Sequence, residues 1–326
     1  MSSLDITMHD IYLAKRRIAS IAMRPPLVSS PPLSEHVGAS VYLKLEGLQE
    51  TGAFKIRGAA NKMLGLSAEE RARGVVAVST GNHGRAVAYV ARKLGIKAVI
   101  CLSETVPRNK VEALRRLGAE VVVQGKSYDE AAEQAARLQE EQGLIMIHPF
   151  DDPAVIAGQG TIGLELLEDL PGIDMAVVPL SGGGLASGIA LALKSADAAI
   201  RVVGVSMDRA PVMYQSLRAG RPLEMEEEET IADALMGGIG LDNRYTFRLC
   251  QQYLDETVLV SDEEIAAAMA FALREHHLVV EGGGAVGIAA LLQRRVAVGR
   301  NVAVVLSGSN VDLPLLLKVA QEYSDG

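Results

Sequence analysis

The sequence predicts an α/β protein in which open, mainly parallel sheets are flanked by helices. Short apolar runs rich in Val and Ile alternate with amphipathic helical patterns along most of the 326 residues. Several of these runs end in small polar or glycine-rich turns that open a helix. Short buried strands that alternate with helices form βαβ units, whose crossover connections make the strands parallel. Ligands of such sheets bind at the carboxyl ends of the strands, so these turns are candidate sites.

The expected strands are short, apolar and β-branched, and they cover residues 41–45, 75–79, 98–102, 121–124, 145–148, 175–179, 202–206 and 302–307. Helical patterns lie between most of them, for example over residues 84–94, 110–117 and 129–141. We expect two domains. Residues 1–64 and 153–326 would form a large domain, and residues 65–152 would form a small domain between its two parts.

Composition excludes several classes of function. The net charge of −8 and the absence of Trp disfavour nucleic acid, because phosphate binding draws on Lys and Arg. Cys101 and Cys250 lie far apart, so neither a disulfide framework nor a zinc site is indicated, and we expect a cytoplasmic protein. The longest uncharged stretch, residues 175–193, contains Pro179 and four glycines, so we expect no membrane segment.

The segment Thr51-Gly52-Ala53-Phe54-Lys55-Ile56-Arg57-Gly58-Ala59 points to a reactive lysine. Lys55 follows an aromatic residue and a glycine-containing turn, and it opens a helix of small residues. A cation near a helix N-terminus is electrostatically unfavourable, which favours the neutral amine. The neutral amine is the form that attacks an aldehyde. A solvated surface lysine is the alternative.

The turn Ser181-Gly182-Gly183-Gly184-Leu185 follows an expected strand and precedes an apolar helix. Consecutive glycines let the backbone approach an anion, and a helix N-terminus presents free N–H groups with a favourable dipole. This pattern favours a phosphate monoester, and the alternative is a tight strand-to-helix turn. Gly282, Gly284 and Gly287 also match a dinucleotide-binding pattern, but the next expected strand ends in Ser307 rather than an acidic residue.

Four motifs occur in an order that resembles the threonine dehydratases and serine racemases, which are fold-type-II (tryptophan-synthase-β-like) pyridoxal 5′-phosphate (PLP) enzymes. They begin at Phe54-Lys55-Ile56, Ser79-Thr80-Gly81-Asn82-His83, Ser181-Gly182-Gly183-Gly184 and Ser307-Gly308-Ser309-Asn310. The resemblance covers nearly the whole chain. Ser79 to Arg85 combined with Val280-Glu281-Gly282-Gly283-Gly284 is most similar to the hydroxyectoine-utilisation dehydratase.

The resemblance implies a role for each motif. Lys55 would bind PLP covalently and then act as the base at Cα of the substrate. The remaining cofactor contacts would be Phe54 beside the pyridine ring, Asn82 on the 3′-oxygen, Gly182, Gly183, Gly184 and Leu185 around the phosphate, and Ser307 at the pyridine nitrogen. The substrate carboxylate would lie on Ser79, Thr80, Gly81, Asn82 and His83.

Thr80 is a second catalytic candidate, because it stands where serine racemases carry a Ser that acts as acid and base on the second face of the substrate. Its added methyl group disfavours that role and hence racemisation. The resemblance therefore implies a dehydratase that removes water and ammonia from a small β-hydroxy amino acid to give a keto acid. Serine, threonine, 3-hydroxyaspartate and a hydroxylated 2,4-diaminobutyrate all satisfy this chemistry. The family also implies a homodimer.

Other functions on the same scaffold stay open. They are racemisation, β-replacement as in cysteine synthases, and non-catalytic ligand binding. Cysteine synthases typically carry a Lys-Asp-Arg run where this chain has Lys55-Ile56-Arg57. The presence of Lys55, Asn82 and Ser307 argues against a non-catalytic relative.

No metal site is expected. The six histidines show no metal-binding spacing. Several serine racemases and related dehydratases bind a divalent cation through a Glu and an Asp that flank a backbone carbonyl, after the strand that follows the glycine loop's helix. Alignment on Tyr214-Gln215 places Ser206 and Val212 at these two positions, and Val supplies no side-chain oxygen.

Overall fold

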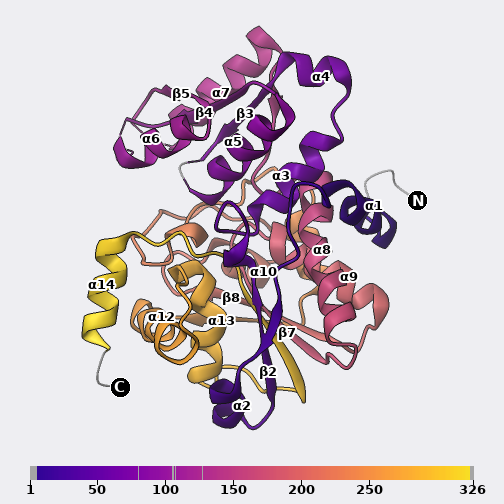
Figure 1. The fold of residues 1–326 in the computed structure, drawn as a ribbon, viewed down its shortest axis with the longest axis vertical. Coiled ribbons are helices and arrows are strands. Elements are labelled where there is room, and N and C mark those ends of the chain that lie inside the picture. Colours follow the sequence, from indigo (N-terminus) through magenta and orange to yellow (C-terminus); the bar gives the residue numbers. More distant parts are fainter. Residues whose placement is uncertain (1–5, 80, 105, 107, 127, 324–326) are drawn as a thin grey trace.

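The computed structural model describes residues 6–79, 81–104, 106, 108–126 and 128–323, and it contains two sheets (Figure 1). The strand order is β1-β2-β10-β7-β8-β9 in the six-stranded sheet and β5-β4-β3-β6 in the four-stranded sheet. The strands are β1 Leu27–Ser29, β2 Ser40–Leu45, β3 Val75–Val78, β4 Ala98–Leu102, β5 Glu120–Val123, β6 Ile145–Met146, β7 Met175–Pro179, β8 Arg201–Met207, β9 Glu256–Val260 and β10 Asn301–Leu306.

Helices cover both sheets. They are α1 Met8–Ile18, α2 Pro31–Val37, α3 Lys55–Leu64, α4 Ala68–Arg73, α5 Asn82–Leu94, α6 Arg108–Arg116, α7 Tyr128–Gln142, α8 Pro153–Asp169, α9 Gly184–Ala196, α10 Val212–Ala219, α11 Thr246–Tyr253, α12 Asp262–His276, α13 Gly282–Leu292 and α14 Leu313–Glu322, with 3-10 turns η1 Glu46–Leu48 and η2 Asp233–Leu235.

The sheets confirm the predicted α/β class with mainly parallel strands. All strand pairs described in the two sheets are parallel except β1 with β2. β10 pairs with β2 on one side and with β7 on the other, so an early and a late part of the chain meet at the centre of the large sheet. Each expected strand is present, with shifts of one or two residues at some ends, whereas β1 and β9 were not predicted.

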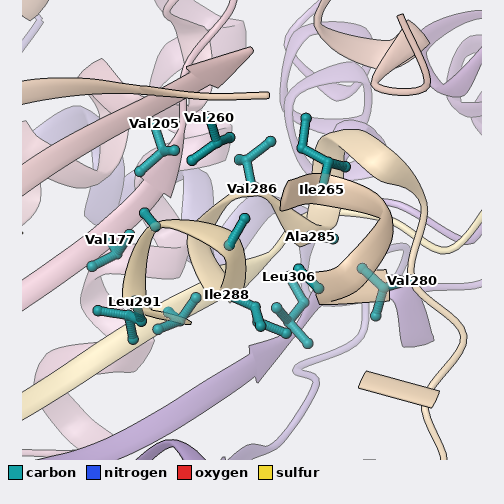
Figure 2. Packing of buried hydrophobic residues seen from close by; sticks show 14 of the residues in the cluster. Val177, Val205, Val260, Ile265, Val280, Ala285, Val286, Ile288, Leu291 and Leu306 are labelled. Atoms are coloured by element: carbon teal, nitrogen blue, oxygen red, sulfur yellow. The ribbon is translucent and has the colours of Figure 1, made fainter. Parts of the chain in front are cut away.

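The large sheet is buried on both faces because its two central strands are almost entirely apolar: β7 at all of its positions and β10 from Val302 to Leu306. Along β7, Val177 belongs to one hydrophobic cluster with α12 and α13, and Val178 belongs to another with α8 and α9. Side chains alternate between the two faces of a strand, so each face receives its own layer of helices. Figure 2 shows α13 packed in the first cluster, with Val286 and Ile288 among the side chains of the strands.

The glycines that match a dinucleotide-binding pattern serve this packing. A Cβ atom at Gly287 would lie 2.7 Å from Cγ1 of Val304, and one at Gly284 would lie 2.8 Å from the carbonyl oxygen of Gly308. These positions therefore let α13 approach the sheet and the segment after β10 closely. The four-stranded sheet comes from residues 75–146 and the six-stranded sheet from the flanking parts, but the domain limits at 64/65 and 152/153 stay a prediction. No helix within the described ranges combines the length and the apolar character that crossing a membrane requires.

Candidate active site

The loop before α3 is joined to the segment after β10, which brings Lys55 close to Ser307. The backbone N–H of Phe54 donates to the carbonyl oxygen of Ser307 over 3.0 Å, and Ala53 forms an antiparallel bridge with Gly308. These residues lie at the carboxyl end of β10, in the centre of the large sheet. The two motifs, far apart in the sequence, are therefore parts of one site.

Lys55 is the first residue of α3, as the sequence predicts. Its Nζ donates to the carbonyl oxygen of Pro149 over 2.8 Å and lies 5.2 Å from the centroid of the Phe54 ring. Burial of the amine lowers the pKa of Lys55 to about 8, and the carboxylate of Glu281 opposes this effect. The neutral, nucleophilic amine is therefore much more accessible near neutral pH than in an ordinary lysine.

Residues 147–152 connect β6 to α8 and contact several parts of the site. The carbonyl oxygen of Ile147 is 2.7 Å from Nε2 of His83, so this nitrogen carries the proton. The side chain of Phe150 packs beneath the glycine loop, where a Cβ atom on Gly184 would lie 2.9 Å from Cβ of Phe150. The Asp151 carboxylate accepts from three backbone N–H groups at the start of α11.

The motif that begins at Ser79 forms the start of α5. The helix begins at Asn82 with Gly81 as its N-cap, and none of the described residues caps it with a side chain. Its first-turn N–H groups are therefore available for a carboxylate. Oγ of Ser79 accepts from the N–H of Gly81 over 3.3 Å, and Thr80 lies outside the described residues.

The imidazole of His83 does not extend into an open loop, because its side chain is 4% exposed. Burial first, and then the positive charge of Lys55, lower the pKa of His83 to about 3. The ring is neutral at ordinary pH and already bonded to Ile147. A contact of His83 with substrate would therefore use its backbone N–H.

The glycine loop precedes α9 and has the shape of an anion cradle. Gly183 has φ +85°, which side chains disfavour, and a Cβ atom there would lie 2.9 Å from Cε of Met213. Within the described ranges no side chain caps α9, and Leu185 in its first turn is buried. Uncapped N–H groups at the start of a buried helix fit a phosphate, whereas a side chain at Gly182 or Gly184 would overlap Phe150.

Ser307 directly follows β10 and is 4% exposed. Its hydroxyl donates to the carbonyl oxygen of Gly283 over 3.5 Å. A hydroxyl at this position is neutral, so it can donate to or accept from a ring nitrogen without changing its charge.

Sequence reasoning missed the group of Glu281, Asn310 and Arg85 around Asn82. The Asn82 side-chain amide donates to Oε1 of Glu281 over 2.7 Å and accepts from Nδ2 of Asn310 over 2.7 Å. Asn310 in turn accepts from Nη1 of Arg85 over 3.0 Å. One signal was present in the sequence, because Glu281 is the only charged residue between positions 278 and 292.

A buried ionic network lies beneath Lys55. The guanidinium of Arg57 makes two hydrogen bonds to the carboxylate of Glu46, each 2.8 Å long, and further bonds to Glu165 of 2.7 and 2.8 Å. Lys44 forms an ion pair with Glu165 at 2.6 Å. The network joins β2, η1, α3 and α8, and it therefore fixes the first turn of the helix that carries Lys55.

Together, these features fit an α/β enzyme that would bind a phosphate-bearing aldehyde through a lysine. The glycine cradle at α9 and the neutral hydroxyl of Ser307 follow the carboxyl ends of the central strands β7 and β10, and the loop before Lys55 is joined to the segment after β10. A family model described as pyridoxal-phosphate dependent enzyme matches residues 20–308. The chain belongs to this family; it is a PLP-dependent lyase with the fold-type-II architecture.

Individual relatives agree with this assignment. An L-threonine ammonia-lyase of Thermotoga maritima is 46% identical over 314 residues, which cover 96% of this chain and 78% of the relative. The structure of maize serine racemase superposes with a TM-score of 0.91 at 36% identity and covers 98% of both chains. The processed form of threonine deaminase isoform 2 from Solanum lycopersicum gives a TM-score of 0.88 at 36% identity, covering 96% of this chain and 93% of the other.

Proposed function

We propose that this PLP-dependent dehydratase acts on L-threonine or L-serine and releases ammonia and a 2-keto acid. The observation that carries the proposal is the position of Lys55, whose amine has a lowered pKa and lies on a helix that faces the carboxyl end of β10. The relatives named L-threonine ammonia-lyase support the substrate class, at 46% and 43% identity.

The residues of the site fit PLP. Lys55 would hold its aldehyde carbon, the α9 N-terminus with Gly182, Gly183 and Gly184 would hold its phosphate, and Ser307 would face its ring nitrogen. When bound, PLP draws electrons from the Cα of an attached amino acid and so acidifies the Cα proton.

Groups of the protein would bind the substrate and move its protons. The first-turn N–H groups of α5 would bind the substrate carboxylate and orient the Cα–H bond. The amine of Lys55 would take the Cα proton as general base. The β-hydroxyl would leave with a proton as water, and water would be taken up again when the released enamine hydrolyses to the keto acid and ammonia. Because Ser307 brings no negative charge, the ring nitrogen would stay unprotonated, which favours prompt elimination over transamination.

Racemisation is the second candidate function. The similarity to maize serine racemase favours it, because that structure covers 98% of this chain. Thr80 in place of a Ser disfavours it, since an added methyl group would hinder an acid or base at the second face of the substrate. A hydroxyectoine-derived amino acid, such as a hydroxylated 2,4-diaminobutyrate, is the alternative substrate for elimination.

One assay separates these functions. Purified enzyme with PLP is incubated with L-threonine, L-serine, 3-hydroxyaspartate and hydroxylated 2,4-diaminobutyrate, and keto acid and ammonia are measured together with D-serine. We expect keto acid and ammonia in equal amounts from L-threonine or L-serine. D-serine without ammonia would establish the racemase instead. Activity confined to the diaminobutyrate would contradict the proposed substrate, and no release from any of the four compounds would overturn the dehydratase.

We further propose a cytoplasmic homodimer whose domains divide at residues 64/65 and 152/153. The reducing compartment is supported by Cys101 and Cys250, which are buried free thiols. The dimer rests on the family resemblance, and light scattering of the purified holoenzyme would test it.

A further inference from the structure

Glu281, Asn82 and Asn310 form a closed ring of hydrogen bonds. Oε1 of Glu281 accepts from Nδ2 of Asn82 over 2.7 Å, and Oε2 accepts from the backbone N–H of Asn310 over 3.1 Å. Nδ2 of Asn310 closes the ring by donating to Oδ1 of Asn82 over 2.7 Å. The three residues come from α5, the N-cap of α13 and the segment after β10, so the ring joins the helix of the small sheet to the large sheet.

The direction of every hydrogen bond in this ring is fixed by two neighbouring groups, one that can only accept and one that can only donate. The carbonyl oxygen of Thr51 can only accept, and it receives Nδ2 of Asn310 over 2.8 Å. The guanidinium of Arg85 can only donate, and it binds Oδ1 of the same amide. The orientation of Asn310 is therefore set, and it obliges Asn82 to present its oxygen to Asn310 and one Nδ2–H to Glu281.

Glu281 is not used to cap its own helix. It is the N-cap residue of α13, yet its side chain makes no capping hydrogen bond. The carboxylate is instead directed to two other elements although it is only 3% exposed. A buried carboxylate is costly unless its hydrogen bonds offset the loss of hydration. We therefore ask what the Glu281 carboxylate does for its two partners in the ring.

We propose that Glu281 is a positioning residue of the reaction, whose ionised carboxylate holds the Asn82 amide with its second Nδ2–H available to the ring oxygen of PLP. The inference rests on the proposed role of Asn82 as the contact to that oxygen. Within the described part of the chain, this second N–H has no protein partner. Glu281 thus acts through Asn82 and does not itself touch the cofactor.

Protonation of Glu281 opens the ring. Both of its partners are N–H donors, so a proton on either oxygen would face a donor and one hydrogen bond would be lost. Burial first, and then the charge of Asp233, raise the pKa of Glu281 to about 7, while its bonds to Asn82 and Asn310 and the charge of Arg85 oppose this. The amine of Lys55 also faces Glu281, whereas His83 has a pKa of about 3 and does not titrate in this range. The ring is therefore closed above about pH 7 and opens below it.

A double-mutant cycle tests whether Glu281 acts through Asn82. Glu281→Gln, Asn82→Ala and the double variant are prepared as apoenzymes, and the dissociation constant of PLP is measured by titration of the visible absorption band. Loss of a hydrogen bond to a charged group predicts an increase of about 10-fold for Glu281→Gln. In the Asn82→Ala background the same change should add less than about 2-fold, because the residue through which it acts is gone. Equal increases in both backgrounds would overturn the proposal, as would an unchanged dissociation constant for Glu281→Gln.

Asp233→Asn tests the inference without altering the ring. It keeps the inference testable if the Glu281→Gln variant does not fold. Asp233 lies on η2 with a side chain that is 61% exposed, and it forms a 3.6 Å ion pair with Lys110. The visible absorption band of the PLP-loaded enzyme is recorded as a function of pH. Removing the charge of Asp233 should move the spectral change on the acid side to lower pH and leave the spectrum above about pH 8 unchanged. A spectral change on the acid side that stays in place contradicts the inference. These titrations use no substrate, so they remain decisive even where the ammonia-release assay rejects the proposed function.

Discussion

The ε-amino nitrogen of Lys55 lies 2.8 Å from the carbonyl oxygen of Pro149, 94 positions further along the chain. The same 147–152 connection binds the ring of His83 and packs beneath the glycine loop. A single peptide segment thus contacts the reactive amine, the start of α5 and the start of α9. The segment therefore fixes the relative positions of the three groups that would hold the aldehyde carbon, the substrate carboxylate and the phosphate.

Replacing Lys55 with Ala should abolish both covalent cofactor binding and elimination, because the proposed site depends on this amine for both steps. The visible absorption band and ammonia release report these two losses, and circular dichroism reports the fold. Lys93→Ala is the matched control, since Lys93 is an exposed lysine of α5 that lies over Tyr89. A Lys55→Ala enzyme with normal turnover would refute the assignment.

Gly183→Ala should weaken PLP binding and destabilise the fold. The left-handed backbone at φ +85° costs about 1–2 kcal/mol for Ala. Contact of the new methyl with Met213 and Cys250 adds about 1–3 kcal/mol. Gly220→Ala is the control, because its φ is +71° but no atom lies within 4 Å of a Cβ there. Denaturant unfolding and PLP titration should show the backbone cost in both variants and weakened PLP binding only at Gly183; equal PLP affinities would exclude the cradle.

Arg57→Met should lower the free energy of unfolding by about 3–5 kcal/mol, because it leaves the buried carboxylates of Glu46 and Glu165 without their main partner. Arg24→Met, which breaks surface pairs with Glu168 and Asp169, should cost less than about 1 kcal/mol for each pair. Denaturant unfolding measures both. Similar losses in the two variants would show that the buried network does not stabilise the fold.

The same network predicts how stability depends on pH. Burial raises the pKa of Glu165, but the hydrogen bonds and charge of Arg57 outweigh it and hold that pKa below its ordinary value. A depressed carboxylate pKa stabilises the folded protein above the unfolded pKa and loses this effect as the pH falls through the folded pKa. Wild-type stability should therefore decrease below about pH 4.5, and Arg57→Met should show a smaller decrease in unfolding experiments.

Ser307→Asp should slow elimination and produce transamination as a side reaction. An adjacent carboxylate raises the pKa of the pyridine nitrogen and so favours its protonation. Ser307→Ala adds no charge and should keep elimination as the main reaction. Keto-acid release and the spectrum of the aminated cofactor measure the two outcomes. Identical rates and spectra for Ser307→Asp and the wild type would show that Ser307 lies away from the nitrogen.

Chelation by EDTA should leave the elimination rate unchanged. Ser206 at the end of β8 donates to the sulfur of Met207, and Val212 at the start of α10 is buried and apolar. Val212 has no side-chain oxygen and the hydroxyl of Ser206 carries no charge, so the pair lacks the carboxylates that Mg²⁺ or Ca²⁺ sites usually include. The absence of a metal there stays a prediction until tested. A rate that falls with EDTA and returns with Mg²⁺ would contradict it.

The interior of the fold was the most predictable part. β4 and β7 have the expected limits because every one of their residues is buried and β-branched or otherwise apolar, which yields a continuous run. β9, Glu256–Val260, was missed although Thr257, Val258 and Val260 are β-branched; it is a partly exposed edge strand and lacks the continuous burial of β4 and β7. β1 escaped because it has only three residues and precedes two prolines.

The site was predictable where function requires unusual local sequence and not where it requires long-range contacts. Consecutive glycines and a lysine after an aromatic residue are visible in one short segment. The bond between Asn82 and Asn310 joins residues 228 positions apart, so no local pattern announces it. The direction of the His83 ring was equally hidden, because it depends on the carbonyl oxygen of Ile147 in the connection from β6 to α8.

The central place of β10 has a consequence for how the protein is made. The four-stranded sheet consists of one continuous stretch, so it can assemble soon after those residues leave the ribosome. The large sheet cannot, because β2 and β7 lack their shared neighbour until residues 301–306 have been synthesised. Until then two apolar strands present unpaired edges, which attract foreign strands. The loop before Lys55 pairs with Ser307 and Gly308, so the proposed site cannot form before these residues have been synthesised.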